Sequence, residues 1–492
     1  MLEVAFEALK ILLDPGRFVY LLLGVAIGSF IGVIPGIGGA VGMAIVLPFV
    51  FGMDAYTGMA LLIGMIAVLH KTDTFPSVLL GIPGSAGAQA TIVDGFPLAK
   101  KGEAARALGA SYVATLFGGI FGGIALFLAI QIAKPLILSL GSPELLMLAL
   151  LGLSMVGVLT GKNAMIGIGA GVFGLLLGSV GAAPSVTEYR YSFDSLYLQH
   201  GISLPILALG LFAFPVMIDL LADGTGGIAK TQKVGSGLWQ GMKDAFNHKF
   251  LIFRSSVIGA IIGFVPGLGG SVVDWISYGL AKQTEKNTEN FGKGDIRGVI
   301  APESSNSAKE GGSLIPTLLF GIPGSATTAM LLGGFTLMGI QAGPKMLGED
   351  LDLTMTIIWT LVLANVVGAI VCIALTKQIS KMTLIPGTIL VPILLVILTV
   401  GAYQSTRHWG DIILFFVIGI IGWIMSRLGW PRAAVLIGFV LSTPIERYLW
   451  ISMSRYGFDW ITNTGVIIIG MLIVFIIIGA VIINRRGGAI ES

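Results

Sequence analysis

The 492-residue chain has few charged residues, one cysteine and four histidines. Charged residues make up 11% of it and hydrophobic residues 55%, whereas a soluble globular domain has roughly 25% charged residues. This composition excludes a large soluble enzyme and indicates an integral membrane protein. The single Cys372 excludes disulfides and thiol metal sites within one chain. The net charge of +3 is too small and too dispersed to indicate a nucleic-acid partner.

Two common enzyme signatures are also missing from the sequence. There is no G-x-x-x-x-G-K-[ST] sequence, which excludes nucleotide hydrolysis by a P-loop, and there is no H-E-x-x-H zinc signature. The four histidines are scattered and do not form a metal-binding pattern. We therefore expect no catalytic residues and no cofactor, with Na⁺ considered only as a coupling ion.

Apolar runs fill most of the chain. Residues 104–133, 410–425 and 461–484 are long enough to cross a bilayer, which takes about 20 residues. We predict an all-α polytopic membrane protein with about 10–12 transmembrane helices, because continuous apolar helices indicate a bundle rather than a barrel. Residues 1–17 alternate apolar and charged side chains, which indicates a helix lying on the membrane surface.

Two motifs occur twice in the same order. The sequence GIPGSA stands at 81–86 and again at 321–326, and a Pro-Gly-rich segment stands at 31–39 and again at 262–270. Recurrence of both motifs at similar spacing predicts two membrane repeats. The expected organisation is an interfacial helix at 1–17, repeat 1 at 18–222, a linker at 223–249, and repeat 2 with the C-terminal helices at 250–492.

Each Pro-Gly pair lies in an apolar run, where it breaks a helix and leaves backbone N–H groups unpaired. In a bilayer such a break is tolerated only where it is buried in protein or lines a cavity. Each repeat is therefore expected to hold a Pro/Gly-broken helix and a re-entrant-type loop, with a solute site between the repeats. The loop after the first GIPGSA contains Lys100, Lys101 and Arg106, whereas its counterpart has Lys345 among acidic residues. Because Lys and Arg mark the cytoplasmic side, the repeats are predicted to be inverted.

Helix N-termini at the breaks carry partial positive charge and free N–H donors, which suit carboxylates or phosphates. Hydroxyls just beyond the breaks could reach the same ligand, or they could only satisfy the broken backbone. The predicted substrate-binding residues are Pro35, Gly36, Gly38, Lys71, Pro83, Gly84, Ser85, Gly267, Gly269, Ser271, Gly324, Ser325, Thr327 and Thr328.

Two polar stretches lie beside these motifs, at 70–74 and 303–306. Carboxylate and amide oxygens suit a hard cation such as Na⁺, and ionisable groups at membrane depth are costly and often functional. The alternatives are a helix cap at the membrane surface for the first stretch and an exposed loop that includes Lys309 for the second. The predicted ion-coupling residues are Asp73, Glu303 and Asn306. Later arginines, including Arg427 and Arg432, indicate anchors at the membrane edge.

These motifs, in this order, resemble the large membrane subunit of the tripartite tricarboxylate transporters. The sequences at 94–104 and 301–306 add to the resemblance, which covers most of the chain. It implies a multi-pass protein of the bacterial inner membrane that imports a carboxylate with a cation gradient. Its implied partners are a small four-helix membrane subunit and a periplasmic solute-binding protein. The chain departs from the family pattern at 70–75 and 309–310, which leaves the solute and the coupling ion open.

Two other functions share parts of this pattern. An anion channel would use the same helix ends and need no coupling ion. An intramembrane enzyme acting on lipid-linked carboxylates would need a paired acid and base, for which only His70 with Asp73 offers a hint. The predicted function is a cation-coupled transporter subunit for di- or tricarboxylates, with the channel and the enzyme as alternatives.

Overall fold

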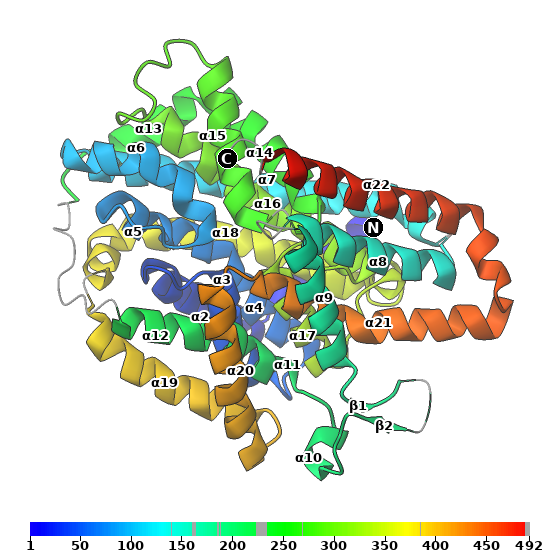
Figure 1. Ribbon diagram of the computed structural model, residues 1–492. Coiled ribbons are helices and arrows are strands. Elements are labelled where there is room, and N and C mark those ends of the chain that lie inside the picture. The colour runs from blue at the N-terminus through cyan, green and yellow to red at the C-terminus, as the bar shows by residue number, and fades with distance from the viewer. Residues whose placement is uncertain are drawn as a thin grey trace.

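Helices make up nearly all of the structure (Figure 1). The computed structural model describes residues 1–138, 140–159, 164–184, 186, 188–222, 234–267, 269–383 and 385–487. Within these ranges the strands are β1 (Gly181–Ala182) and β2 (Tyr189–Arg190), which pair antiparallel. The prediction of an all-α polytopic membrane protein is confirmed.

Eight helical segments in the described ranges are long and apolar enough to cross a membrane. They are Pro15–Val33, Ala55–Leu79, Ala104–Pro135, Leu204–Ala222, Leu351–Met382, Gly387–Gln404, Trp409–Arg427 and Arg432–Tyr456. Shorter apolar helices accompany them at Gly39–Val50, Ser142–Met155, Ala164–Gly178, Ala326–Leu337 and Thr464–Ile478.

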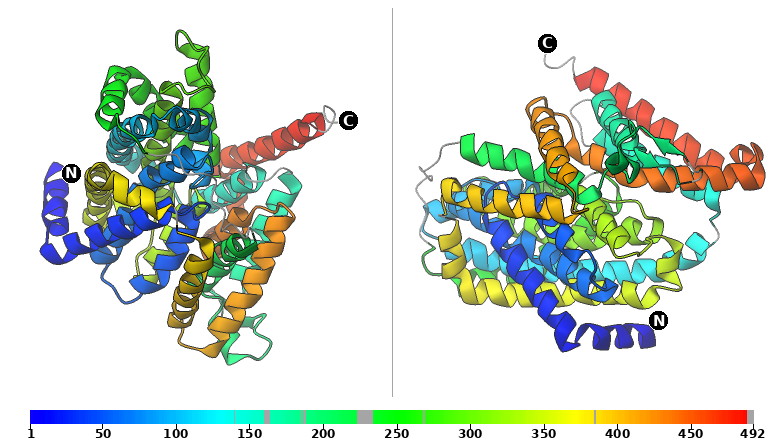
Figure 2. Two further views of the ribbon diagram at one scale, coloured as in Figure 1. Left: turned by 90° about the vertical axis from the view of Figure 1, so that its left-hand side faces the viewer. Right: turned by 90° about the horizontal axis from the view of Figure 1, so that it is seen from below.

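The first half of the chain begins with α1 (Leu2–Leu12), which lies at the edge of the molecule (Figure 2). The elements that follow are α2 (Pro15–Val33), α3 (Gly39–Val46), η1 (Leu47–Val50), α4 (Ala55–Thr72), α5 (Thr74–Leu79), η2 (Ala86–Ala88), α6 (Gln89–Lys100) and α7 (Ala104–Leu138). Both α2 and α4 are started by an aspartate. The Asp14 carboxylate accepts from the Gly16 N–H at 3.1 Å, and the Asp54 carboxylate accepts from the Tyr56 N–H at 3.1 Å.

The second half repeats this order. Its elements are α13 (Leu238–Asn247), α14 (Lys249–Phe264), α15 (Gly269–Thr284), α16 (Arg297–Phe320), α17 (Ala326–Leu337), η4 (Pro344–Leu347) and α18 (Leu351–Met382). Helix α13 lies within the segment 223–249 that was expected to be a linker, and residues 223–233 of that segment lie outside the described residues.

Further helices follow each half. After α7 come α8 (Ser142–Leu159), α9 (Ala164–Gly178), α10 (Leu196–Gln199), α11 (Leu204–Ala208), the π-helical turn η3 (Leu209–Ala213) and α12 (Phe214–Ala222). After α18 come α19 (Gly387–Gln404), α20 (Trp409–Arg427), α21 (Arg432–Tyr456), η5 (Asp459–Thr462) and α22 (Thr464–Gly487). Helices α8, α9, α21 and α22 pack together on one side of the molecule (Figure 1).

Equivalent helix pairs pack through equivalent glycines. In the first half, α2 runs parallel to α4, and a Cβ at Gly28 would collide with the Met65 carbonyl. In the second half, α14 packs on α16 in the same way, and a Cβ at Gly259 would collide with the Ser305 carbonyl. Small residues allow such close helix contact in membranes. The internal repeat read from two short motifs therefore extends over whole helices.

The two halves are related by an approximate two-fold axis. His70 on α4 contacts Glu310 on α16, which stands 240 residues later at the equivalent position. Thr74, four residues after His70, contacts Glu303, seven residues before Glu310. Successive contacts therefore run forward along the first half and backward along the second. The two segments therefore cross antiparallel, with the axis perpendicular to them. If α4 and α16 cross the membrane, that axis lies in its plane, which agrees with the predicted inversion.

The halves also exchange contacts reciprocally. Helix α7 packs on α16, and its equivalent α18 packs on α4. Helix α13 packs on α7 through an ion pair between Arg106 and Asp244 at 2.5 Å, and α1 packs on α18, where the Trp359 indole N–H donates to the Ala5 carbonyl at 2.8 Å. The repeats are thus interlocked rather than laid side by side.

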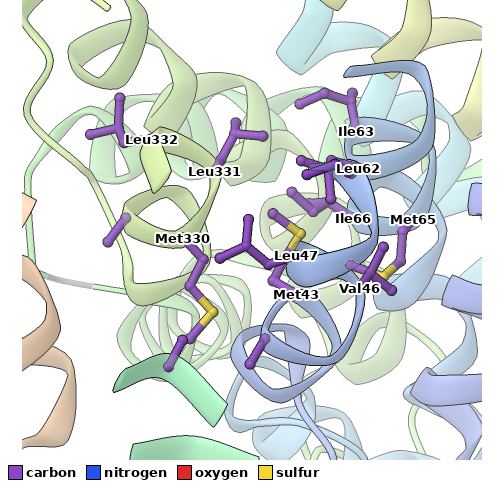
Figure 3. Packing of buried hydrophobic residues seen from close by; sticks show 14 of the residues in the cluster. Met43, Val46, Leu47, Leu62, Ile63, Met65, Ile66, Met330, Leu331 and Leu332 are labelled. Atoms are coloured by element: carbon purple, nitrogen blue, oxygen red, sulfur yellow. The ribbon is translucent and has the colours of Figure 1, made fainter. Parts of the chain in front are cut away.

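The apolar core joins both halves. Met43, Val46 and Leu47 of α3 and η1 face Leu62 and Ile66 of α4, while Met330 and Leu331 of α17 approach from the second half (Figure 3). These side chains are almost entirely buried. Because α17 starts at the last residue of the second GIPGSA, Ala326, this packing fixes one broken helix against the repeat that contains the other.

Candidate functional site

In each half the two Pro-Gly breaks meet tip to tip. The Gly36 N–H donates to the Pro83 carbonyl at 3.4 Å, and the Gly267 N–H donates to the Gly324 carbonyl at 3.1 Å. Gly36 and Gly267 have φ angles of +79° and +89°, a region that favours glycine. The sequence places these four residues in two separate motifs per half, and the structure brings each pair together.

Serine hydroxyls cap the helical turns that follow the breaks. The Ser85 hydroxyl accepts from the Gly87 N–H at 3.2 Å, and the Ser325 hydroxyl accepts from the Thr328 N–H at 3.2 Å. The Thr328 hydroxyl accepts from the Ser325 N–H at 2.9 Å, which completes a capping box at the start of α17. Thr328 is completely buried, so its hydroxyl caps the helix and faces no open space.

A cavity of about 440 Å³ opens where the two halves meet. The first half contributes Gly38, Gly39, Ala40, His70, Ser85, Ala86 and Gly87. The second half contributes Gly267, Val272, Lys309, Ser325, Ala326 and Thr327. A further wall comes from Phe212 on η3 and from Trp430, Pro431, Arg432, Ala433 and Ile437 at the start of α21. A second, larger cavity between α2, α3, η1, α4 and α19 is lined almost wholly by apolar side chains.

Apart from Lys71, the predicted substrate-binding residues divide into three groups. Those that line the cavity are Gly38, Ser85, Gly267, Ser325 and Thr327. Those that shape the loops behind its lining are Pro35, Gly36, Pro83, Gly84, Gly324 and Thr328. Gly269 and Ser271 belong to α15, and their surroundings lie outside what the structure describes.

Lys71 lies outside the cavity lining. It is completely buried, and its ammonium group donates to the Asn365 side-chain oxygen on α18 at 2.5 Å. Burying an ammonium group is costly unless it is hydrogen-bonded. In this structure Lys71 therefore joins α4 to α18, and direct contact with a solute would require it to leave this site.

Three ionisable side chains meet at the two-fold axis. The Glu310 Oε1 atom lies 2.8 Å from His70 Nε2 and 2.6 Å from Lys309 Nζ. His70 and Lys309 both line the cavity, and each side chain is at most one-tenth exposed. The alternative that Lys309 belongs to an exposed loop is wrong, because the residue is buried within α16.

Asp73 and Asn306 lie beside this cluster. The Ser85 hydroxyl donates to Asp73 Oδ2 at 2.5 Å, and the Asn306 amide donates to the Gly87 carbonyl at 2.8 Å. The ring atom His70 Nδ1 lies 3.3 Å from Asp73 Oδ2 and 3.2 Å from Asn306 Nδ2. The other oxygens of both residues, Asp73 Oδ1 and Asn306 Oδ1, are buried with no hydrogen-bond partner among the described residues. Two buried oxygens without partners suit a small cation.

Glu303 differs from these two residues. One carboxylate oxygen accepts from the Thr74 hydroxyl at 2.8 Å, and the other accepts from the Thr91 hydroxyl on α6 at 2.6 Å. Both oxygens are therefore used in joining α5 and α6 to α16. The structure places Glu303 next to the predicted ion-coupling group, with no oxygen free of a protein donor.

The comparison with known families now bears on this arrangement. The family described as "Tripartite tricarboxylate transporter TctA family" matches residues 18–437, which include all four Pro-Gly breaks and every residue lining the cavity. The chain belongs to the TctA family. The resemblance seen in the motifs is confirmed, and a TctA-family protein is a subunit of a tricarboxylate transporter.

Relatives of this TctA-family chain are found in bacteria and archaea. A protein of Agrobacterium vitis named "Uncharacterized 52.8 kDa protein in TAR-I ttuC' 3'region" is 31% identical over 91% of this chain and 88% of its own length. A second protein of that organism is 34% identical over 39% of this chain and 79% of its own length. A protein of Methanocaldococcus jannaschii is 24% identical over 74% of this chain and 81% of its own length. No solved structure matches the chain.

The sequence did not point to two of the charged residues in the cavity of this TctA-family protein. The sequence gives Lys309 as part of an exposed loop and as a departure from the family pattern, without naming it as a site residue, and it indicates that Arg432 is an anchor at the membrane edge. The structure places both in the cavity lining. The sequence does contain a signal for Arg432. Gly429 and Pro431 interrupt an apolar region just before it, as glycine and proline do in the repeated motifs.

Proposed function

We propose that the chain is the large transmembrane subunit of a binding-protein-dependent secondary transporter that imports di- or tricarboxylates with a gradient of Na⁺ or H⁺. The observation that carries the proposal is the cavity between the repeats, into which both broken helices present their N-terminal ends. Donor-rich helix ends favour an anion there. Ser325 and Thr327 would donate hydroxyl hydrogen bonds to the carboxylate, whereas the Ser85 hydroxyl proton is already donated to Asp73.

The coupling ion would bind beside the solute. Asp73 Oδ1 and Asn306 Oδ1 are buried oxygens without a hydrogen-bond partner among the described residues, and Ser85 connects Asp73 to the cavity lining. A cation near Asp73 would attract the solute carboxylate through this short link, so that each favours binding of the other. The alternative coupling ion is a proton, which Asp73 or His70 would accept.

The distribution of charge supports an orientation in the membrane. The end of α6 and the start of α16 bring together Lys100, Lys101, Lys293 and Arg297, and the Lys101 ammonium group donates to the Lys293 carbonyl at 2.6 Å. At the start of α18 the Tyr56 hydroxyl donates to Asp352 beside further acidic residues. We place the basic face in the cytoplasm and the acidic face outside. The latter would meet the solute-binding protein, with a small four-helix subunit as the second partner.

Uptake of labelled carboxylates into proteoliposomes containing all three subunits tests this function. We expect accumulation above the external concentration when a Na⁺ or proton gradient is imposed, and loss of that accumulation when the gradient is removed. Accumulation that ignores both gradients would overturn the coupling. Equilibration without accumulation would identify an anion channel instead.

The variant Asp73→Ser tests the ion-coupling residue in the same assay. Serine is the residue at the equivalent position of the second half, Ser313. We expect uptake to lose its dependence on the cation gradient, because the buried carboxylate is removed. Unchanged cation dependence in this variant would exclude Asp73 as the coupling site. It would not contradict the proposal that the protein takes up carboxylates.

A further inference from the structure

One wall of the cavity is formed by α21, which lies outside the two repeated Pro-Gly motifs. Helix α20 ends at Arg427, the chain turns at Gly429 with a φ angle of +69°, and α21 begins at Arg432. The first residues of α21 line the cavity together with Phe212 on the π-helical turn η3. A π-helical turn is rare and is often found at functional sites. The charge that this wall brings to the cavity is the Arg432 guanidinium.

The Arg432 guanidinium has no carboxylate of the described residues within ion-pair distance; the acidic residue whose charge acts on it is Asp219, which is paired with Arg427. The guanidinium donates to the Leu211 carbonyl at 3.0 Å, and its carbon lies 5.7 Å from the centre of the Phe212 ring. None of the ion pairs between described residues includes Arg432. An arginine has five N–H donors in a planar fork that matches a carboxylate. A carbonyl and an aromatic face leave most of these donors available.

Arg427 provides a contrast within the same hairpin. It too lies over an aromatic ring, that of Trp423 at 5.5 Å, but it is paired with Asp219 at 2.9 Å. The Arg427 side chain is 58% exposed, and it is absent from the cavity lining. Of the two arginines, the paired one faces the outside and the unpaired one faces the cavity.

Lys309 lies on another wall of the cavity, and its charge is neutralised by its neighbour Glu310. Its ammonium group is paired with Glu310 at 2.6 Å, so α16 brings almost no net charge to the cavity through this pair. The positive charge of the cavity that lacks a directly paired carboxylate among the described residues is therefore that of Arg432. This charge is separate from the donors at the start of α17, which belong to another element.

We propose that Arg432 binds a second carboxylate of the solute, whose first carboxylate is held by the hydroxyls and N–H groups of the broken helices. The solute is then a dicarboxylate or a larger polycarboxylate rather than a monocarboxylate. This inference rests on the proposed function and adds the residue that selects the number of carboxylates. The fork of Arg432 would bind the carboxylate in a bidentate manner, which a lysine cannot reproduce.

The test compares two ligands of the same carbon skeleton, succinate and monomethyl succinate. Their binding to the purified full-length protein in lipid nanodiscs is measured by calorimetry for the wild type, Arg432→Gln, Arg432→Lys and Arg427→Gln. Arg432→Gln is expected to weaken succinate binding about tenfold or more and to leave monomethyl succinate within about twofold. Arg432→Lys is expected to fall between wild type and Arg432→Gln. Arg427→Gln is the matched control and is expected to bind both ligands as the wild type does.

Binding of the monoester shows that the Arg432 variants are folded. Equal losses for both ligands, or no loss for either, would overturn the selection of a second carboxylate by Arg432. An equal loss in Arg427→Gln would also overturn it, because the effect would then not belong to the cavity. If the wild type binds neither ligand nor any other carboxylate, the proposed function fails as well.

Discussion

The two GIPGSA breaks have nearly the same backbone but different chemistry around them. In both, the isoleucine N–H donates to a proline carbonyl six residues earlier, at 3.4 Å for Ile82 and 3.2 Å for Ile322. The second glycine N–H in both lies 3.4 Å from a hydroxyl oxygen seven residues earlier, that of Ser77 or Thr317. The peptide path of the broken helix is therefore held by the same local bonds twice.

The side chains around the two breaks have diverged. Asp73 in the first half corresponds to Ser313 in the second, and His70 corresponds to Glu310. Beside the first break lie two buried oxygens that suit a cation, Asp73 Oδ1 of the first half and Asn306 Oδ1 of α16, while α16 also presents Lys309 to the cavity. The comparison teaches that the shared backbone builds the two helix ends, whereas a few substituted positions decide which ion each end can serve.

The largest expected effect comes from breaking the contact between the halves with Glu310→Gln. The Glu310 carboxylate is the partner of both His70 and Lys309, and all three are buried. Removing one partner of a buried ion pair leaves an uncompensated charge, so we expect a loss of about 3–5 kcal/mol in the free energy of unfolding, measured by denaturant titration in detergent.

An exposed pair serves as the control for this variant. Lys345 and Glu349 lie 3.4 Å apart with side chains more than half exposed. Glu349→Gln should cost less than about 1 kcal/mol. Equal losses for the two variants would show that the contact at the axis is no stronger than a surface ion pair.

Alanine at the second glycine of each motif gives an intermediate effect and separates the two breaks. A Cβ at Gly84 would collide with the Asp73 backbone, whereas a Cβ at Gly324 would lie 2.9 Å from the Ser313 Cβ and 3.1 Å from the Gly263 carbonyl oxygen. Both variants should be destabilised by about 1–3 kcal/mol, with Gly84→Ala the more affected. Denaturant titration of both proteins measures the difference.

Gly348 offers a control outside the breaks, because no atom lies within 4 Å of the Cβ it would gain. Gly348→Ala should leave the free energy of unfolding nearly unchanged. If Gly324→Ala costs more than Gly84→Ala, the ranking of the two breaks by backbone contact is wrong.

The smallest expected effect distinguishes two neighbouring threonines after the second break. Thr328 completes the capping box of α17, and its replacement by valine should cost about 1 kcal/mol of stability. Thr327 lines the cavity, so Thr327→Val should leave stability nearly unchanged and weaken carboxylate binding instead. Thermal unfolding and ligand titration of both variants check this, and a reversed pattern would exchange the roles of the two residues.

Much of the fold could be predicted from the sequence because its signals are local. Pro-Gly pairs within apolar runs mark broken helices wherever they occur, and their recurrence in order reveals a repeat. The charge of the loops at 100–106 and 345–352 indicates inversion, since Lys and Arg report the side of the membrane. The antiparallel crossing of α4 and α16 agrees with that prediction.

The composition of the site was harder to predict because it depends on contacts between distant segments. The polar run at 303–310 looks like an exposed loop by hydropathy, yet it is a buried part of α16 whose side chains bond to α4, α5 and α6. Likewise, Lys71 looks available for an anion until Asn365, 294 residues away, is seen to bind it. Arg432 belongs to the cavity only because α21 begins there.

The contact between His70 and Glu310 also bears on how such a chain could arise from two copies of one half. At a two-fold axis between identical halves, a residue faces its own copy. Two ionised glutamates or two protonated histidines would then face each other, and both are repulsive pairs of like charge. Joining the halves in one chain lets the two positions differ. The attractive pair of His70 with Glu310 is therefore a contact that two identical subunits could not have made.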